Sequence, residues 1–133
     1  MGTPQAGVFD EAPDHHYYLE YRLPAGTDLA DLRPVLREVI GLAPEGGHVV
    51  LAFGRDAWTR LRPEGVPSQL EDFVPIGTEA CMAPATQRDI WVWILGDFAA
   101  SALDAALSIQ SRMVSVADLE LGCAGFRRPE KRG

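Results

Sequence analysis

The sequence has no hydrophobic run long enough to cross a membrane. Its longest unbroken apolar stretch covers residues 90–95, whereas a membrane helix needs about 20 apolar residues. The first residues also lack a basic segment followed by an apolar stretch, which is how a signal peptide begins. The sequence therefore predicts neither a transmembrane helix nor a secretory leader.

Cysteine and positive charge are both scarce. The two cysteines, Cys81 and Cys123, exclude a disulfide-rich secreted scaffold and predict a reducing, cytoplasmic location. A single disulfide between them stays open. Lys and Arg total 12 against 19 Asp and Glu, which gives a net charge of −7. This balance argues against a nucleic acid or an anionic membrane as the partner.

The usual spacings of metal-binding and catalytic residues are missing too. His15 and His16 are adjacent, so on a strand their rings point to opposite faces and cannot chelate one metal. His48 has no Cys or His at ligand spacing, and residues 45–47 form a turn signal rather than a phosphate-binding loop. Haem ligation by a histidine or a cysteine is chemically allowed, but no pattern favours it over an ordinary packed side chain.

What the sequence does contain is the composition of one globular domain. It has 133 residues, of which 47% are hydrophobic and 23% charged, enough to build a hydrophobic core. We expect the first helix to start near Asp31, because Pro34 is tolerated only in a first turn, and we expect Asp97 to cap the last helix. Periodicity predicts strands over residues 15–23, 48–54, 89–95 and 115–126, and helices over residues 31–40, 56–61 and 97–113.

Residues 63–88 interrupt this regular pattern. They hold four prolines and two glycines and predict a long loop with one short helical turn. Loops of this length are often functional or interfacial, so we expect residues 73–86 to be ordered and packed against the third strand or a partner. In the alternative, apolar residues such as Phe73, Val74 and Ile76 tuck into the edge of the domain.

The order of elements defines an α+β fold. Strand, helix, strand, strand, helix, strand is the ferredoxin-like βαββαβ arrangement, a four-stranded antiparallel sheet backed by helices on one face. The chain then divides into an N-terminal arm (residues 1–14), the domain (residues 15–128) and a polar tail (residues 129–133).

The third strand carries the strongest functional signal. Ile90, Val92 and Ile94 point to one face and Trp91, Trp93 and Leu95 to the other, and a sheet with one face in water should alternate apolar with polar residues instead. The second face is therefore expected to be covered, either by the chain's own long loop or by another polypeptide. The expected interface residues are Trp91, Trp93, Leu95, Tyr18 and Val50.

Four segments share motifs with one enzyme family. Residues 4–9 (PQAGVF) resemble an opening Pro-Gln-x-Gly-Ile, and residues 51–61 (LAFGRDAWTRL) resemble a strand followed by Gly, Trp and a short helix. Within residues 72–90, APATQRD matches Ala-Pro-x-Thr-x-x-Asp, and residues 125–127 read Gly-Phe-Arg. In this order, the segments resemble the N-terminal half of the dye-decolourising (Dyp-type) haem peroxidases.

The sequence departs from that family in two places. Residues 122–124 read Gly-Cys-Ala where the family commonly has Glu-x-His, and the family's Gly-x-x-Asp-Gly motif is absent. The proximal His and distal Arg also belong to the family's second half, so no catalytic residue is carried over. The resemblance implies a sheet that packs against a second ferredoxin-like half, which holds most of the haem site.

Three functions follow as hypotheses. The first is a non-catalytic subunit that pairs with a separately encoded haem-binding half, with no haem expected in the isolated chain. In the second, two copies of this chain join through their sheets and bind a small molecule or haem without peroxidase activity. The third is a structural fragment without a ligand.

Overall fold

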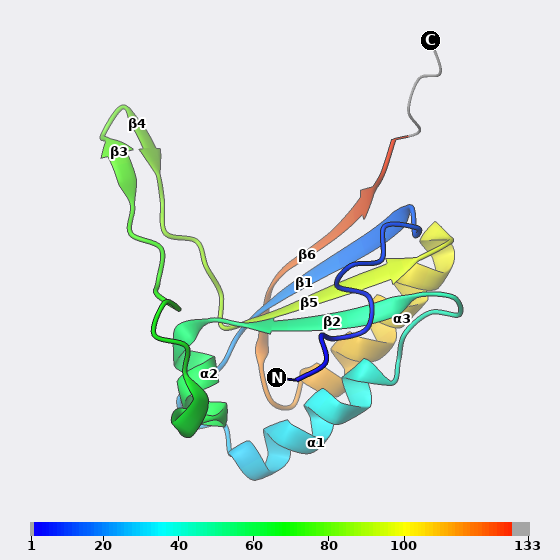
Figure 1. Cartoon of the computed structure of the whole chain (residues 1–133), viewed down its shortest axis with the longest axis horizontal. Coiled ribbons are helices and arrows are strands. Elements are labelled where there is room, and N and C mark those ends of the chain that lie inside the picture. The colour runs from blue at the N-terminus through cyan, green and yellow to red at the C-terminus, as the bar shows by residue number, and fades with distance from the viewer. Residues whose placement is uncertain (1, 129–133) are drawn as a thin grey trace.

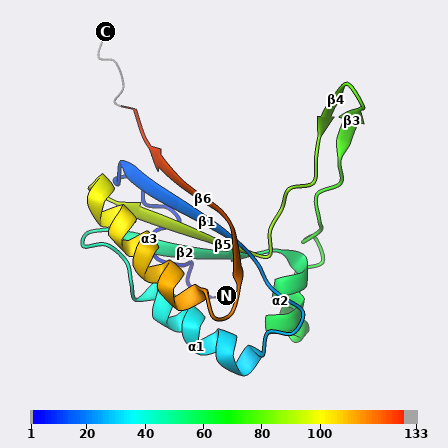
Figure 2. The same cartoon turned by 180° about the vertical axis from the view of Figure 1, so that it is seen from behind.

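A four-stranded antiparallel sheet with two helices on one face forms the body of the molecule. The computed structural model describes residues 2–128. The sheet has the order β2-β5-β1-β6, and α1 and α3 cover the same face of it (Figures 1 and 2). In chain order the elements are β1 (His15–Arg22), α1 (Leu29–Ile40), β2 (His48–Phe53), α2 (Arg55–Leu61), the 3-10 turn η1 (Pro63–Gly65), β3 (Ile76–Thr78), β4 (Cys81–Ala83), β5 (Ile90–Gly96), α3 (Ala99–Met113) and β6 (Asp118–Phe126).

This order confirms the predicted ferredoxin-like fold. Each of the three pairings in the sheet is antiparallel, and β1 and β5 are the two central strands. α2, η1 and the β3–β4 hairpin are inserted between β2 and β5. None of the described helices is long and apolar enough to cross a membrane.

The core lies between the sheet and the helices. Ile90, Val92 and Ile94 of β5 are each fully buried there, as their period-two spacing predicts. Tyr21 of β1 is also fully buried, and its hydroxyl donates a 2.6 Å hydrogen bond to Oε1 of Gln110 on α3. Burial raises the pKa of Tyr21 above its usual alkaline value.

Both predicted helix starts were wrong. α1 begins at Leu29, because the Asp28 carboxylate accepts a hydrogen bond from the Ala30 amide and so caps the helix earlier. Pro34 lies inside α1. Because it has no backbone N–H, the helix lacks one hydrogen bond there and continues through it. α3 starts after Phe98, whose side chain makes no cap bond, rather than after Asp97.

The long loop is more regular than predicted, and it does not pack on the sheet. β3 and β4 form a two-stranded hairpin that projects away from the body (Figure 1). Phe73, Val74, Ile76 and Met82 are all exposed. The expectation that this segment packs against the third strand, and the alternative that it tucks into the domain edge, are therefore both wrong for these four residues. Packing against a partner stays a prediction.

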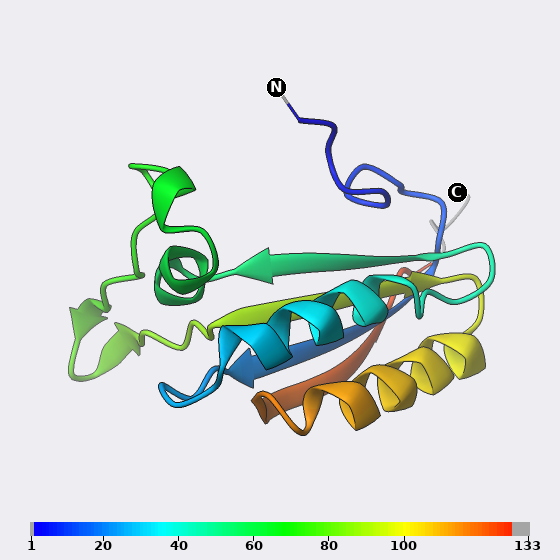
Figure 3. The same cartoon turned by 90° about the horizontal axis from the view of Figure 1, so that it is seen from below.

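The N-terminal arm, rather than the long loop, contacts the sheet at the edge strand β2. Gln5 pairs its side-chain amide with both backbone groups of Leu51, at 2.6 and 3.0 Å, which satisfies the outer edge of β2 much as a neighbouring strand would. Asp10 lies 3.0 Å from Nε2 of His48. Figure 3 shows the arm and the two long helices on opposite sides of β2. The predicted tail, residues 129–133, lies outside the described residues.

The core predicts a clear contrast between two positions of α3. Ile109 is fully buried, whereas Leu107 is 61% exposed. Ile109→Ala should lower the free energy of unfolding by about 2–4 kcal/mol through the cavity it leaves, and Leu107→Ala should change it by less than about 0.5 kcal/mol. Urea unfolding of the two variants measures both values. Equal losses would contradict the packing of α3 described here.

Candidate functional site: the aromatic sheet face

Four aromatic rings gather on the sheet face that α1 and α3 leave free. We call His16, Tyr18, Trp91 and Trp93 the aromatic layer. Tyr18 and Trp93 are direct cross-strand partners of β1 and β5, so both project from the same face. His16 and Trp91 follow by period two. All four rings are half-buried, which leaves part of each accessible to a partner.

The rings stack along the strands. Ring centroids lie 5.9 Å apart for Tyr18–Trp91, 5.8 Å for His16–Trp93 and 5.7 Å for Trp91–Trp93. Neighbouring planes differ by 7° to 23°. These are offset-stacked separations, each worth roughly 0.5–1.5 kcal/mol beyond simple burial. The layer is therefore ordered in the chain itself and presents a preformed surface.

A hydrogen bond fixes the protonation of one ring. The indole Nε1–H of Trp93 donates to Nδ1 of His16 at 3.0 Å, so Nδ1 must carry a lone pair and the imidazole must be neutral. Burial lowers the pKa of His16, and the positive charges of Arg127 and His15 lower it further, against a smaller opposing effect of Asp14. The sequence indicated Tyr18 and the tryptophans but not His16, although its period-two spacing from Tyr18 was a usable signal.

The remaining predicted interface residues are not equally accessible. Val50 is 5% exposed and Leu95 is 0% exposed, and neither belongs to the core cluster under the helices. They lie on the same face as Trp93 and His16, as their cross-strand pairing requires, but within this chain they are already buried. On the β6 side, Leu121 is 46% exposed and faces the same way as Glu20, its partner on β1.

A close backbone approach holds Tyr18 in place. A Cβ at Gly125 would lie only 2.8 Å from Cε2 of Tyr18, so any side chain there would push the ring aside. Gly125 is the first residue of the Gly-Phe-Arg segment seen in the sequence. Its lack of a side chain lets β6 pass beneath the layer.

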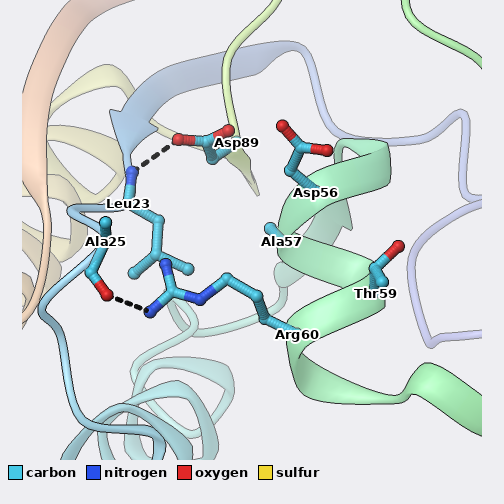
Figure 4. Close-up of a pocket in the computed structure, with 7 residues that line it drawn as sticks. All are labelled: Leu23, Ala25, Asp56, Ala57, Thr59, Arg60 and Asp89. Atoms are coloured by element: carbon cyan, nitrogen blue, oxygen red, sulfur yellow. Dashed lines mark hydrogen bonds between the residues drawn. The ribbon is translucent and has the colours of Figure 1, made fainter.

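A hollow of about 430 Å³ lies between α2 and the end of β1 (Figure 4). There Arg60 donates to the carbonyls of Pro24 and Thr27 at 3.0 and 2.9 Å, and Asp89 accepts from the Leu23 amide at 2.7 Å. These side chains are committed to holding the turn before α1.

A ferredoxin-like α+β half with one aromatic sheet face matches, over residues 5–127, the family model described as Dyp-type peroxidase, N-terminal. The chain belongs to this family. No curated protein matches the sequence.

Solved structures agree with this fold. A Dyp-type peroxidase protein of Shewanella oneidensis is 25% identical, with a TM-score of 0.80 over 99% of this chain and 45% of its own. The encapsulated Dyp-type peroxidase of Mycobacterium smegmatis, at 22% identity, gives 0.83 with the same coverages. The dye-decolorizing protein of Vibrio cholerae gives 0.82 at 19% identity, over 97% of this chain and 45% of its own. The chain thus spans a little under half the length of these neighbours.

The described residues do not fit a haem site. Nδ1 of His16 accepts the Trp93 bond and His48 pairs with Asp10. Cys81 and Cys123 are both exposed and free, so the disulfide left open above is not formed. His15 lines a hollow of only about 300 Å³, at the lower end for a small-ligand pocket. Residues 2–128 also bring together no group of three metal-ligating side chains, and we assign no haem ligand to this chain.

The His16–Trp93 bond predicts a pH effect. The pKa of His16 in the folded state lies below its usual 6.5, so the unfolded chain binds the proton first as pH falls. The stability that neutral His16 contributes is complete above pH 6.5 and is lost as pH falls through the lowered pKa. The Trp93 indole N–H signal in ¹H–¹⁵N NMR spectra should shift in that acidic range and stay constant above it. An indole signal that does not respond to acid, or one that changes only above pH 7, would contradict the bond.

Proposed function

We propose that this chain is the non-catalytic half of a Dyp-type haem peroxidase-like oxidoreductase. In this proposal it packs sheet to sheet against a second ferredoxin-like half, supplied by a separate chain, which binds the haem. The aromatic layer is the contact surface. The observation that carries the proposal is the set of half-buried stacked rings on a sheet face that the chain's own loop leaves free.

The chemistry of the face supports a protein partner. Trp and Tyr are enriched among the residues that dominate binding energy at interfaces, and they contribute most when the partner excludes water from them. Leu121 adds apolar area at the β6 side, and Glu20 and Arg22 add charge at the β1 end of the face. This is an apolar centre with a charged margin, which is the usual anatomy of an interface.

The length of the chain relative to the similar solved structures supports a partner that supplies the second half of the fold. The chain aligns with less than half of each neighbour's length. The described residues offer no haem ligand, so in this proposal the axial ligand and the groups that act on peroxide come from the partner. The role of this chain is then to cover the partner's sheet, exclude water from the shared core and hold the partner's strands in register.

Removing the two tryptophans should break the assembly. Trp91→Ser with Trp93→Ser deletes two interface aromatics, each worth roughly 2 kcal/mol or more at the centre of an interface, so affinity should fall at least about a hundredfold. The test co-expresses the chain with the product of a neighbouring gene that encodes a second Dyp-type half, and co-purification and sedimentation measure the complex. Circular dichroism checks that the helices and sheet remain.

A matched control comes from the helix side. Leu107→Ser with Val114→Ser removes two exposed apolar side chains that face away from the sheet, and the complex should form normally. A wild-type chain that stays monomeric beside its genomic neighbour would refute the pairing. A symmetric dimer of this chain would refute the two-chain form in favour of self-pairing, and a single polypeptide carrying both halves would refute the separate partner.

Haem-dependent activity should require the partner. In this proposal the partner anchors the iron, and peroxide cleavage needs both an anchored iron and a positioned proton-transfer group. Mixed with haem, the 133-residue chain should oxidise a dye no faster than free haem does, whereas the co-purified complex should turn over with saturation. Saturable turnover by the chain alone would overturn this division of roles.

A further inference from the structure

A second candidate site lies on the other side of the molecule, between α1 and α2. It is a hollow of about 700 Å³, within the range of small-molecule pockets. α1 forms one wall, and α2 with η1 forms the other; Phe53 at the end of β2 closes the inner end. The hollow is distinct from the aromatic layer, because it lies along the helices rather than on the open sheet face.

Positive charge is concentrated there. Arg33, Arg37, Arg60 and Arg62 all line the hollow, although the whole chain has only 12 Lys and Arg and a net charge of −7. The lining holds one carboxylate, Glu64, so its formal charge is 4 − 1 = +3. A local excess of this kind in an acidic protein attracts anions and gathers them at one place.

Two of the four arginines already donate hydrogen bonds to backbone carbonyls. Arg60 holds the turn before α1, and Arg33 donates to the carbonyl of Leu61 at 2.6 Å. Arg62 makes one long contact to Glu64, at 3.5 Å and well exposed. Within residues 2–128, the side chain of Arg37 makes neither a hydrogen bond nor a salt bridge. Arg37 and Arg62 therefore keep guanidinium donors for a ligand.

The floor of the hollow is apolar and aromatic. Leu36 is buried, and Phe53, Trp58 and Leu61 are half-buried. The Phe53 and Trp58 rings lie 5.9 Å apart at 52°, and Trp58 is held by a 2.9 Å hydrogen bond from its indole to the Gly65 carbonyl. The indole is thus fixed in place, and its polar atom is already satisfied, so a ligand meets chiefly its apolar surface.

We propose that this hollow binds a small aromatic carboxylate. The ring of the ligand would lie on the apolar floor beside Trp58, and the carboxylate would meet the guanidinium groups of Arg37 and Arg62, whose planar donors suit a carboxylate. An inorganic anion would leave the floor empty, and a neutral aromatic would leave the guanidinium groups unused. The proposal does not depend on the pairing proposed above, because no residue of the aromatic layer takes part.

Naphthalene compounds test both halves of this site. The probe is 2-naphthoate, with 2-naphthalenemethanol as its neutral analogue and inorganic phosphate as an anion without a ring. ¹H–¹⁵N NMR of the 133-residue chain follows the three indole signals, and Trp58→Phe assigns the one at the site. We expect 2-naphthoate to shift the Trp58 signal saturably, the alcohol to bind at least about fivefold more weakly, and phosphate not to compete.

Arginine variants then separate the site from general charge. Arg37→Gln with Arg62→Gln should weaken 2-naphthoate about fivefold and leave the alcohol unchanged. Arg112→Gln is the matched control, because Arg112 is also exposed, pairs with Glu38 and lies on α3; it should bind as the wild type does. If the double variant does not fold, Arg37→Gln alone gives the test, since within residues 2–128 that side chain makes no hydrogen bond or salt bridge.

Three results would overturn the proposal. The alcohol could bind as tightly as the carboxylate, which removes the role of the arginines. Arg112→Gln could lose as much affinity as the double variant, which reduces the effect to net charge. The Trp91 and Trp93 signals could move while Trp58 stays still, which places the naphthalene on the aromatic layer instead.

Discussion

The structure depends on a central strand that is apolar on both faces. β5 has two sheet neighbours and supplies Ile90, Val92 and Ile94 to the core under the helices, which satisfies one face. Its other face carries Trp91 and Trp93, and burying an aromatic ring of that size is worth roughly 2–3 kcal/mol. α1 and α3 both lie on one face of the sheet, so Trp91 and Trp93 on the second face stay half-buried within this chain. This incomplete burial is the reason for which we propose a partner on that face.

The chain partly answers this demand by itself. Stacking Tyr18 and His16 against the tryptophans shields part of each indole, and the Trp93–His16 bond satisfies the one polar atom of that ring. The arm pairs with the free edge of β2 through Gln5, which leaves that edge less open to strand addition. These contacts fix the rings and the β2 edge within the chain, while the rings themselves stay half-buried and in part accessible.

Sequence reasoning predicted the features that follow from periodicity. The topology followed from the order of the elements, and the two apolar sides of β5 followed from its unbroken apolar run. The structure buries Ile90, Val92 and Ile94 fully and leaves Trp91 and Trp93 half-buried. What the sequence could not give were outcomes of competition between nearby groups. Asp28 and Asp31 are both able to cap α1, and the hydrogen bond to the Ala30 amide decides between them. The hairpin was missed because β3 and β4 are each three residues long, too short for a period to appear. Val50 and Leu95 were expected to contact a partner, because alternation predicts which face a side chain is on but not how far it is buried.

The two candidate sites differ in what their surroundings allow. A partner on the aromatic layer would cover the sheet face and leave the helix side open, so the arginine-lined hollow between α1 and α2 would stay in contact with solvent in the assembled protein. The aromatic layer itself would not stay in contact with solvent, because stacked rings contribute most binding energy when a partner excludes water from all of them. The sheet face is therefore suited to a large, permanent partner, and the hollow is suited to a small ligand that arrives and leaves. The hollow lies between α1 and α2 and the aromatic layer lies on the free sheet face, so one can be covered without closing the other.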